Sequence, residues 1–338
     1  MLLYEIKYII LAVSIREAQG NGGEMDRNAN KIVLVTQKSR LQELLYKYNT
    51  KAQAKFHIEH MGADFTDYIL EDETYQNALN DVKQIADKYA RLTVVDREFL
   101  PNMLFGKDDI VIAVGRDGLV CNTMKYLSGQ KLIGVNPDSA RWDGVLLPFE
   151  AGELEKIIPQ TITGDCDVRN VTMAKAVTND GQEMLAVNDF FIGPKSHTSA
   201  RYDLTTRHTL SGIITESQSS SGIIVSTGIG QTGWYKSVMA QAKAACGLFG
   251  YAGSDDYEKI GWDEKKLSFV VREPFPSNTT DATVVFGTLS KGDPFRVLSK
   301  MSEKGVIFSD GMEEDEIEFN SGVEVSIGMA ETQGCLVM

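Results

Sequence analysis

The sequence predicts an α/β N-terminal domain with a parallel twisted sheet, followed by a mostly antiparallel, β-sandwich-like C-terminal domain. In the first half, apolar runs alternate with amphipathic helical segments, which is the pattern of parallel βαβ units. After about residue 160 the apolar runs become short and rich in β-branched residues. Between two of these runs, Asn179-Asp180-Gly181 predicts a hairpin. The 338 residues are enough for both domains.

The elements of the first half can be predicted in order. Lys31 to Val35 is expected to be a strand, and Ser39 with Gln42 three residues later predicts the capped start of a helix. The further elements expected here are a helix from Tyr75 to Ala90, strands at Leu92–Val95, Asp109–Val114 and Lys131–Val135, and a short helix carrying Val120, Met124 and Leu127.

The second half is predicted to contain one clear helix, Trp234 to Cys246, among many strands. The acidic stretch Glu313 to Glu318 is expected to be a solvated loop and strand edge. The predicted strands are Val171–Val177, Met184–Ile192, Ile223–Thr227, Leu267–Val271, Thr283–Gly287 and Val323–Ile327. The predicted domains are a peripheral extension at 1–30, an α/β nucleotide-binding domain at 31–155, a β-rich domain with dinucleotide-binding loops at 156–320, and a C-terminal segment at 321–338 that returns to the first domain.

Composition restricts the class of protein. With 43% hydrophobic and 24% charged residues, the chain is an ordinary globular protein with a substantial core. Its net charge of −13 argues against nucleic-acid or anionic-membrane partners. The four cysteines are far apart and predict reduced thiols in a cytoplasmic protein. The apolar start, Met1 to Val13, is too short to span a bilayer and lacks the features of a signal peptide.

The first candidate site is Gly115-Arg116-Asp117-Gly118, which directly follows the apolar strand Ile110–Val114. Open α/β sheets bind ligands beyond the carboxyl ends of their strands, so a carboxylate at this position faces the crevice. Flanking glycines allow ligand phosphates to approach the backbone closely. The local alternative is that Asp117 is a turn or helix-capping residue.

The second candidate site is the turn Thr227-Gly228-Ile229-Gly230-Gln231-Thr232-Gly233, between a strand and a helix. It matches G-x-G-x-x-G, the dinucleotide fingerprint of a Rossmann fold. However, it lies in the β-rich half, and the acidic residues that follow, Asp255 and Asp256, sit in a polar loop. A glycine turn whose free N–H groups contact a nucleotide or phosphate is therefore favoured. No G-x-x-x-x-G-K-[ST] sequence is present, which excludes P-loop chemistry.

A third candidate lies between the two turns, where Asn188 and Asp189 interrupt an otherwise apolar strand. Alternation points one of the two inward, and a buried polar group needs a partner, such as the hydroxyls of a ligand. A bulge or strand end satisfied by the backbone explains the pair equally well.

Taken together, these motifs resemble the NAD kinase family. The order is G-x-D-G, then Asn-Asp or Asn-Glu in a strand, then a Ser-Thr-(Gly/Pro)-x-Gly-x-Thr turn that runs into a helix. The likeness is closest to the branch that includes mitochondrial NAD kinases and covers about residues 31 to 330. It extends to Ile133-Gly-Val-Asn-Pro-Asp138, Asn188-Asp-Phe-Phe-Ile-Gly193, Ser199-Ala-Arg-Tyr202, Ser220-Ser-Gly222 and Val271-Arg-Glu-Pro274.

The resemblance implies a two-domain NAD kinase-like fold with its active site in the cleft between the domains. It implies transfer of the γ-phosphoryl group of ATP to the 2′-hydroxyl of the adenosine ribose of NAD, with Mg²⁺ or another divalent cation, in a homo-oligomer (dimer or tetramer). Asp117 would be the general base, which suits a poor nucleophile such as a ribose hydroxyl. The implied nucleotide-binding residues are Gly115, Arg116, Gly118, Asn188, Asp189, Thr227, Gly228, Gly230, Thr232, Gly233, Trp234 and Ser237.

Three departures from the family pattern leave alternatives open. Arg116 stands where the family has a second glycine; it adds bulk near the phosphates or offers them a cationic fork. Gly228-Ile229 stands where many relatives have Pro-Thr, and Trp234 at the adenine side need only be core packing. The competing functions are a catalytically degenerate dinucleotide-binding or sensing protein, a lipid or sugar kinase of the same broad fold, and a dehydrogenase using the second turn.

Overall fold

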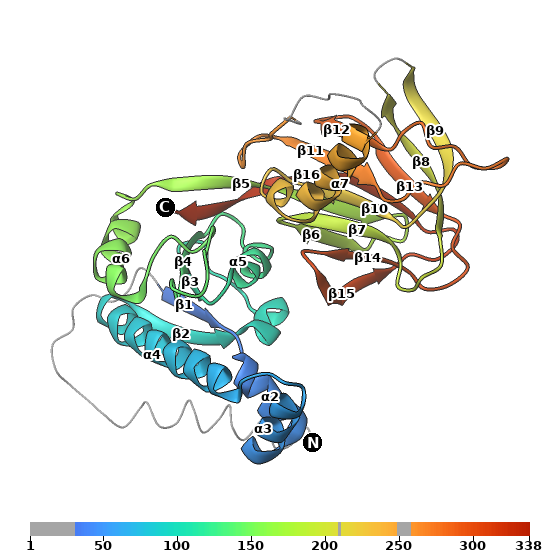
Figure 1. Cartoon of the computed structure of the whole chain (residues 1–338). Coiled ribbons are helices and arrows are strands. Elements are labelled where there is room, and N and C mark those ends of the chain that lie inside the picture. The colour runs from blue at the N-terminus through green and yellow to red at the C-terminus, as the bar shows by residue number, and fades with distance from the viewer. Residues whose placement is uncertain (1–30, 209–210, 249–257) are drawn as a thin grey trace.

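The computed structural model describes residues 31–208, 211–248 and 258–338, which form two domains joined by two long strands (Figure 1). The predicted extension at 1–30 and the loop with Asp255 and Asp256 lie outside these residues.

The first domain contains four parallel strands in the order β2-β1-β3-β4. Their bounds are β1 Lys31–Thr36, β2 Arg91–Asp96, β3 Ile110–Val114 and β4 Lys131–Val135. The helical elements are α2 Arg40–Tyr48, α3 Lys51–His60, α4 Phe65–Tyr89, η1 Arg97–Asn102, α5 Asp117–Met124, η2 Ala151–Glu153 and α6 Leu154–Thr163.

Helices cover both faces of this sheet. In β1, Ile32 and Leu34 pack with α4 and α6, whereas Val33 and Val35 pack with α5. Because alternate strand residues point to opposite faces, strands buried on both sides must be apolar throughout, as β3 is. This arrangement confirms the predicted α/β class.

The sequence predicted some of the helices of the first domain correctly and others not. The capping box of Ser39 and Gln42 is confirmed at the start of α2. The helix predicted from Tyr75 begins ten residues earlier, at Phe65 after the N-cap Asp64, so the predicted start was wrong. Helix α3 was not predicted, because only Ala54 and Ile58 are buried on it and its apolar periodicity is weak.

The second domain is an antiparallel β-sandwich, as predicted. Its strands are β5 Val168–Thr178, β6 Glu183–Ala186, β7 Asp189–Pro194, β8 Ala200–His208, β9 Gly212–Ser220, β10 Ile223–Ser226, β11 Lys266–Val271, β12 Phe286–Ser290, β13 Phe295–Ser299, β14 Gly305–Ser309, β15 Met312–Glu318 and β16 Glu324–Val337. Six of them form one sheet in the order β12-β11-β10-β7-β14-β15. Its core packs against the remaining strands, and α7 (Trp234–Leu248) covers its other face.

Strand β16 joins the two domains. Cys335 and Leu336 pair in parallel with Lys131 and Leu132 of β4, while most of β16 pairs antiparallel with β5. The parallel sheet of the first domain therefore continues without a break into one sheet of the sandwich, and Figure 1 shows β5 and β16 running between the domains.

Two strand predictions in this domain were wrong. The run Met184–Ile192 is not one strand: β6 and β7 belong to different sheets, and the chain crosses between them at Val187 and Asn188. The strand predicted at Thr283–Gly287 lies later, at Phe286–Ser290, because Glu216 binds the backbone N–H groups of Thr283 and Val284. The hairpin at Asn179–Gly181 is confirmed, since β5 and β6 pair antiparallel across it.

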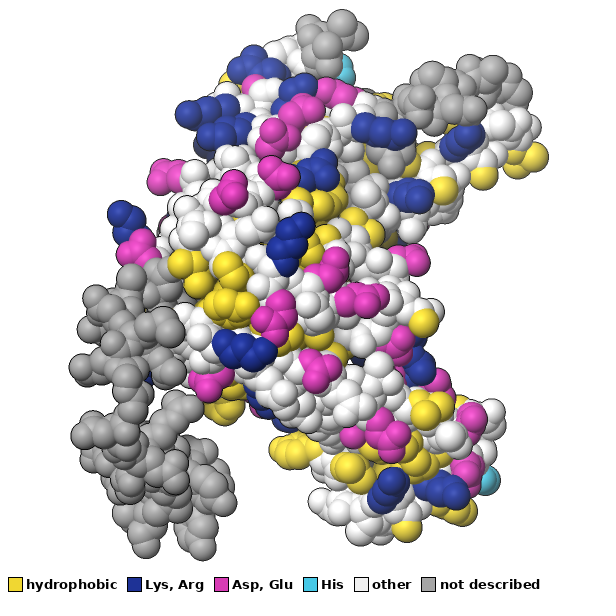
Figure 2. All heavy atoms as spheres, turned by 90° about the vertical axis from the view of Figure 1, so that its left-hand side faces the viewer, with side chains coloured by type: hydrophobic (Ala, Val, Ile, Leu, Met, Phe, Trp, Pro, Cys, Tyr) yellow, Lys and Arg dark blue, Asp and Glu magenta, His cyan; other side chains and the backbone are white. Residues whose placement is uncertain are grey.

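The acidic stretch lies in β15, the outermost strand of its sheet, as its prediction as a strand edge required. Acidic and basic side chains are interspersed over the face seen in Figure 2. None of the helices in the described ranges combines the length and the apolar character that crossing a bilayer requires.

Candidate functional site

The first glycine-rich turn lies at the carboxyl end of β3, beside the end of β1. Tyr75 of α4 ties the two strand ends together, because its hydroxyl accepts from Gln37 N–H at 2.9 Å and donates to the Val114 carbonyl at 3.2 Å. A Cβ at Gly115 would lie 3.0 Å from both Gln37 Nε2 and Leu119 Cδ2, so this glycine allows the close packing. A Cβ at Gly118, in contrast, would meet nothing within 4 Å.

Asp117 is the first residue of α5, and Arg116 is the N-cap. Its side chain is half-buried, and Oδ1 accepts from the backbone N–H of Leu146 at 2.7 Å. The Leu146 segment can come this close because β4 carries Gly134: a Cβ there would lie 2.0 Å from the Leu146 carbonyl oxygen. The glycine of the Ile133–Asp138 motif thus helps to orient the carboxylate of Asp117.

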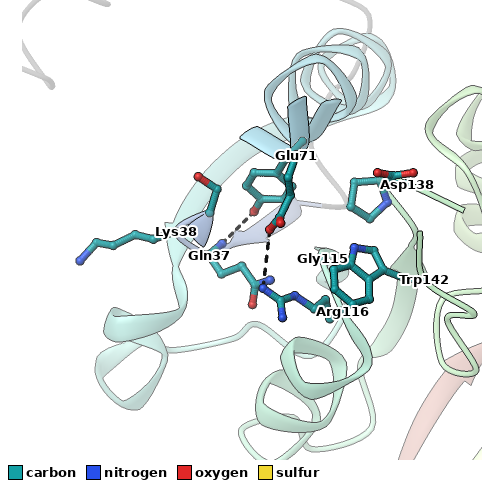
Figure 3. Close-up of a pocket in the computed structure, with 10 residues that line it drawn as sticks. Gln37, Lys38, Glu71, Gly115, Arg116, Asp138 and Trp142 are labelled. Carbon is teal, nitrogen blue, oxygen red and sulfur yellow. Dashed lines mark hydrogen bonds and ion pairs between the residues drawn. The ribbon is translucent and has the colours of Figure 1, made fainter. Parts of the chain in front are cut away.

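Arg116 adopts an extended backbone (φ −110°, ψ 167°), so this turn does not require glycine at its second position. The guanidinium lies 3.7 Å from Glu71 of α4 and 4.8 Å from the centre of the Trp142 ring. Figure 3 shows Arg116 between these two side chains, with its ion pair to Glu71. The arginine is therefore accommodated without strain, and its side chain is 43% exposed.

An ion-pair network surrounds Arg116. Glu71 also binds Arg40, which in turn pairs with Asp67 at 2.9 Å. Arg141 pairs with Asp67 at 2.7 Å, and the two arginines lower the pKa of that carboxyl. The acids offset the arginines around this turn, so any anion that binds Arg116 must compete with Glu71.

The cavity at these strand ends is small. It has a volume of about 20 Å³ and is lined by Gln37, Lys38, Ser39, Glu71, Tyr75, Gly115, Arg116, Pro137, Asp138 and Trp142. A cavity of this volume holds about one water molecule. A nucleotide therefore fits here only if the side chains of Arg116 and Trp142 move.

Asn188 and Asp189 lie where the chain crosses between the sheets. The carboxylate of Asp310 accepts from the backbone N–H groups of three consecutive residues: Val187 at 3.1 Å, Asn188 at 2.6 Å and Asp189 at 3.3 Å. Burial, together with the charge of Asp310, raises the pKa of Asp189 to about 7. The backbone at the motif is thus satisfied by Asp310, and the side chain of Asn188 is left half-buried.

The second glycine-rich turn packs against Asn188. Thr227 N–H donates to the Asn188 carbonyl at 2.9 Å, and Thr227 Oγ1 donates to the Val187 carbonyl at 2.5 Å. A Cβ at Gly230 would lie 1.9 Å from the Asn188 oxygen, and one at Gly228 would lie 2.4 Å from the Gly261 oxygen. Glycine is required at both positions because the backbone of the turn packs directly against the backbones of Asn188 and Gly261.

The expectation of free N–H groups in this turn was wrong at four positions. Gly230 N–H donates to Thr227 Oγ1, and those of Gln231, Thr232 and Gly233 donate to carbonyls within the turn. The turn closes on itself as the 3₁₀ segment Gly230–Thr232, which uses the N–H groups internally.

Helix α5 brings the first turn to the third motif. Cys121 lies one helical turn after Asp117, and its buried side chain belongs to the same apolar cluster as Val187, the neighbour of Asn188, and Ile229 of the second turn. Burial and the charges of Asp310 and Asp117 raise the pKa of this thiol. The three sequence motifs therefore meet around α5, through the apolar cluster that contains Cys121, Val187 and Ile229.

The remaining predicted residues lie at the start of α7. Trp234 stacks on Phe191 with ring centres 5.4 Å apart, and the Arg272 guanidinium lies 5.1 Å from the Trp234 ring. This geometry agrees with the packing alternative for Trp234. Thr232 and Ser237 are exposed, and the Thr232 hydroxyl donates to the Ile229 carbonyl.

A larger cavity of about 500 Å³ lies between the domains, at the other end of α5. Lys125, Tyr126, Met184, Leu185, Ser309 and Ala330 are among its lining residues, whereas Asp117 and Asn188 are not. In the described part of the chain, no group of three or more His, Cys, Asp and Glu side chains could hold a metal ion.

Sequence reasoning missed several residues that shape the site. Glu71 and Trp142 flank Arg116, Asp310 binds the backbone N–H of Asn188, and Lys125 pairs with Asp310. The only local signal was Asp310-Gly311, a two-residue hairpin turn between β14 and β15. Nothing in the sequence indicates that its carboxylate reaches Asn188, because 122 residues separate the two.

The chain has the two-domain fold of NAD kinases: a mixed sheet with parallel strands and helices, plus an antiparallel sheet. One similar solved structure is an NAD kinase from Archaeoglobus fulgidus in complex with ATP, with TM-score 0.52 and 14% identity, covering 91% of this chain and 93% of that one. Another is yeast NADH kinase complexed with NADH, with TM-score 0.56 and 13% identity, covering 92% of this chain and 84% of that one. No protein-family model and no curated protein matches the chain.

Proposed function

We propose that the protein is a NAD kinase-like phosphotransferase that converts NAD to NADP with ATP as the donor. The observation that carries this proposal is the convergence on α5: Asp117 begins the helix, Cys121 packs in one cluster with Val187 and Ile229, and the second turn is bonded to Asn188. The two solved kinases that share the fold are in complex with ATP and with NADH, respectively, which supports nucleotide ligands for this site.

In the proposed reaction, Asp117 accepts the proton of the adenosine 2′-hydroxyl. The 2′-oxygen forms a bond to the γ-phosphorus as the bond to the β–γ bridging oxygen breaks, and ADP leaves. The hydrogen bond from Leu146 occupies Oδ1 and orients the carboxylate, which leaves Oδ2 for the substrate. Asn188 and Asp189 are the proposed contacts for ribose hydroxyls.

The donor side of the site is proposed to consist of Gly115, Arg116 and Gly118. The open space beside Gly118 allows phosphates to approach the start of α5, and the Arg116 guanidinium supplies positive charge to them. Mg²⁺ is proposed as part of the donor substrate, since it is commonly bound through nucleotide phosphates with only one or two protein carboxylates.

Residence in the cytoplasm, a homo-oligomeric state and closeness to the mitochondrial branch are also proposed. They rest on the sequence motifs and composition described above.

The second candidate function is a dinucleotide sensor without catalysis. The small cavity favours it, because Arg116 and Trp142 fill the space beside the first turn. NAD binding with no turnover for any phosphate donor would support this alternative.

The test measures NADP formation from NAD, ATP and Mg²⁺ through an NADP-specific dehydrogenase. We expect Asp117→Asn to lower kcat by roughly 10²–10⁴-fold, which is typical for loss of a general base. Calorimetry should show that the variant still binds NAD. Asp143→Asn is the matched control, because Asp143 is exposed in the loop before Leu146 and its replacement changes charge equally. Full activity in Asp117→Asn would rule out Asp117 as the base.

A further inference from the structure

Lys125 is a buried cation at the C-terminal end of α5. Its side chain is only 6% exposed, and Nζ lies 2.9 Å from Ser309 Oγ and 3.8 Å from Asp310 Oδ2. Asp315 of β15 lies 3.9 Å from the same nitrogen. Since Lys125 belongs to the first domain and its three partners to the second, these contacts cross between the domains.

Asp310, the acidic partner of Lys125, lies in the turn between β14 and β15. It sits in the left-handed region (φ 56°), with Gly311 following at φ 72°, as a two-residue hairpin turn requires. This turn directs the carboxylate, 2% exposed, onto the N–H groups of Val187, Asn188 and Asp189. Asp310 is therefore bound to the backbone of the Asn188 motif and to the helix that carries Asp117.

The spacing along α5 connects these contacts to the proposed site. Asp117, Cys121 and Lys125 follow one another at four-residue intervals, so they lie along one face of the helix. At one end is the proposed base, in the middle Cys121 packs in the apolar cluster that contains Val187, beside Asn188, and at the other end is the ion pair with Asp310. The contacts of Lys125 therefore restrain the movement of α5 relative to the Asn188 segment.

We propose that Lys125 and Asp310 are positioning residues that set the distance between Asp117 and Asn188. Asp310 holds the backbone at Asn188, and Lys125 fastens the helix of Asp117 to Asp310. The inference rests on the proposed function for its kinetic readout, whereas the coupling of the two segments can be measured without it.

The kinetic test compares Lys125→Met with the wild type. We expect kcat for NADP formation to fall about 10–100-fold, because small displacements of reacting groups cost rates of this order. The KM for ATP should change by less than about threefold, and Lys125→Arg should restore most of kcat. Lys175→Met is the matched control: Lys175 lines the same cavity, and its 2.8 Å ion pair with Glu183 joins two strands of the second domain only. Wild-type kcat in Lys125→Met would overturn the proposal.

A second variant separates positioning from stability. Lys125→Met leaves Asp310 buried without its cation, which destabilises the fold. The double variant Lys125→Met/Asp310→Asn removes both charges, so we expect its melting temperature to exceed that of Lys125→Met while kcat stays low. Recovery of wild-type kcat along with stability would show that the pair acts only through folding and would overturn the proposal.

Hydrogen–deuterium exchange tests the coupling without any activity. In Lys125→Met, exchange should rise together in peptides covering residues 117–126 and 184–190, whereas Lys175→Met should leave both unchanged. A rise in only one of the two segments would contradict the inference. If the wild-type protein makes no NADP but both segments respond together, the proposed function fails and the positioning role stands.

Discussion

In the first glycine-rich turn, a Cβ at Gly118 would meet no atom within 4 Å, whereas in the second turn a Cβ at Gly230 would lie 1.9 Å from the carbonyl oxygen of Asn188. In the second turn, four backbone N–H groups also donate hydrogen bonds to acceptors within the turn itself. The two glycines therefore serve different purposes: Gly118 leaves space at the first turn, and Gly230 lets two backbones touch at the second. The first turn is suited to receive a ligand, and the second to hold Asn188 in place.

The largest effect is expected in the second turn. Gly230→Ala should lower the free energy of unfolding by about 4 kcal/mol, because a methyl group would collide with the Asn188 backbone and the turn cannot move without breaking its own hydrogen bonds. Urea unfolding measures this value. Gly247→Ala is the control, since Gly247 lies in α7 and its Cβ would meet no atom within 4 Å. Equal stability of the two variants would contradict the packing role of Gly230.

The next effect is the pH dependence of the free energy of unfolding that arises from Asp189, beside the second turn. Its pKa is raised from 3.8 to about 7 mainly by burial, so the folded state holds the proton more tightly than the unfolded chain. The contribution of protonated Asp189 to the free energy of unfolding is full below about pH 4 and is lost as pH rises toward about 7, an effect of about 4 kcal/mol.

Asp189→Asn removes this titration, so its stability relative to the wild type should grow with pH between about 4 and 8. Urea unfolding of both proteins across this range gives the difference, in which all groups unaffected by the substitution cancel. Because Asp310 contributes to the shift, the curve reports the coupled pair. A difference that is independent of pH would show that Asp189 titrates normally.

A smaller effect is expected at Arg116 in the first turn. Arg116→Gly restores the pattern of the family and removes a cation from the proposed phosphate site. We expect the KM for ATP to rise about tenfold, which corresponds to one charge-assisted hydrogen bond of about 1.4 kcal/mol. Arg116→Lys keeps the charge without the planar fork and should lie between the two. Activity that appears only in Arg116→Gly would instead identify the natural protein as a degenerate kinase.

The smallest effect is expected at Gly118. Gly118→Ala should raise the free energy of unfolding by about 0.5 kcal/mol, because alanine favours the helix and the added methyl group meets no atom. At the same time, NADP formation should fall if phosphates pass close to this backbone. Unchanged kinetics in this more stable variant would show that no ligand approaches Gly118, and the contrast between the turns would weaken.

Some of the fold was predictable because its causes are local. The apolar run before Gly115 could only be a strand buried on both faces, and Ser39 with Gln42 marked the start of α2. Other elements were missed because their causes lie far away in the chain. The break between β6 and β7 depends on the distant carboxylate of Asp310, and apolar periodicity alone cannot reveal it.

Residue order alone determined the succession of βαβ units and β-hairpins, the position of Asp117 beyond a buried strand, and the resemblance carried by the ordered motifs. These features depend on contacts within a few residues or on apolar periodicity, which a linear chain displays directly. Only the tertiary structure decided that Glu71 and Trp142 flank Arg116, that the glycines of the second turn support Asn188, and that Lys125 meets Asp310 across the domains. Each of these depends on segments far apart in the chain, which become neighbours only when the elements of both domains pack together.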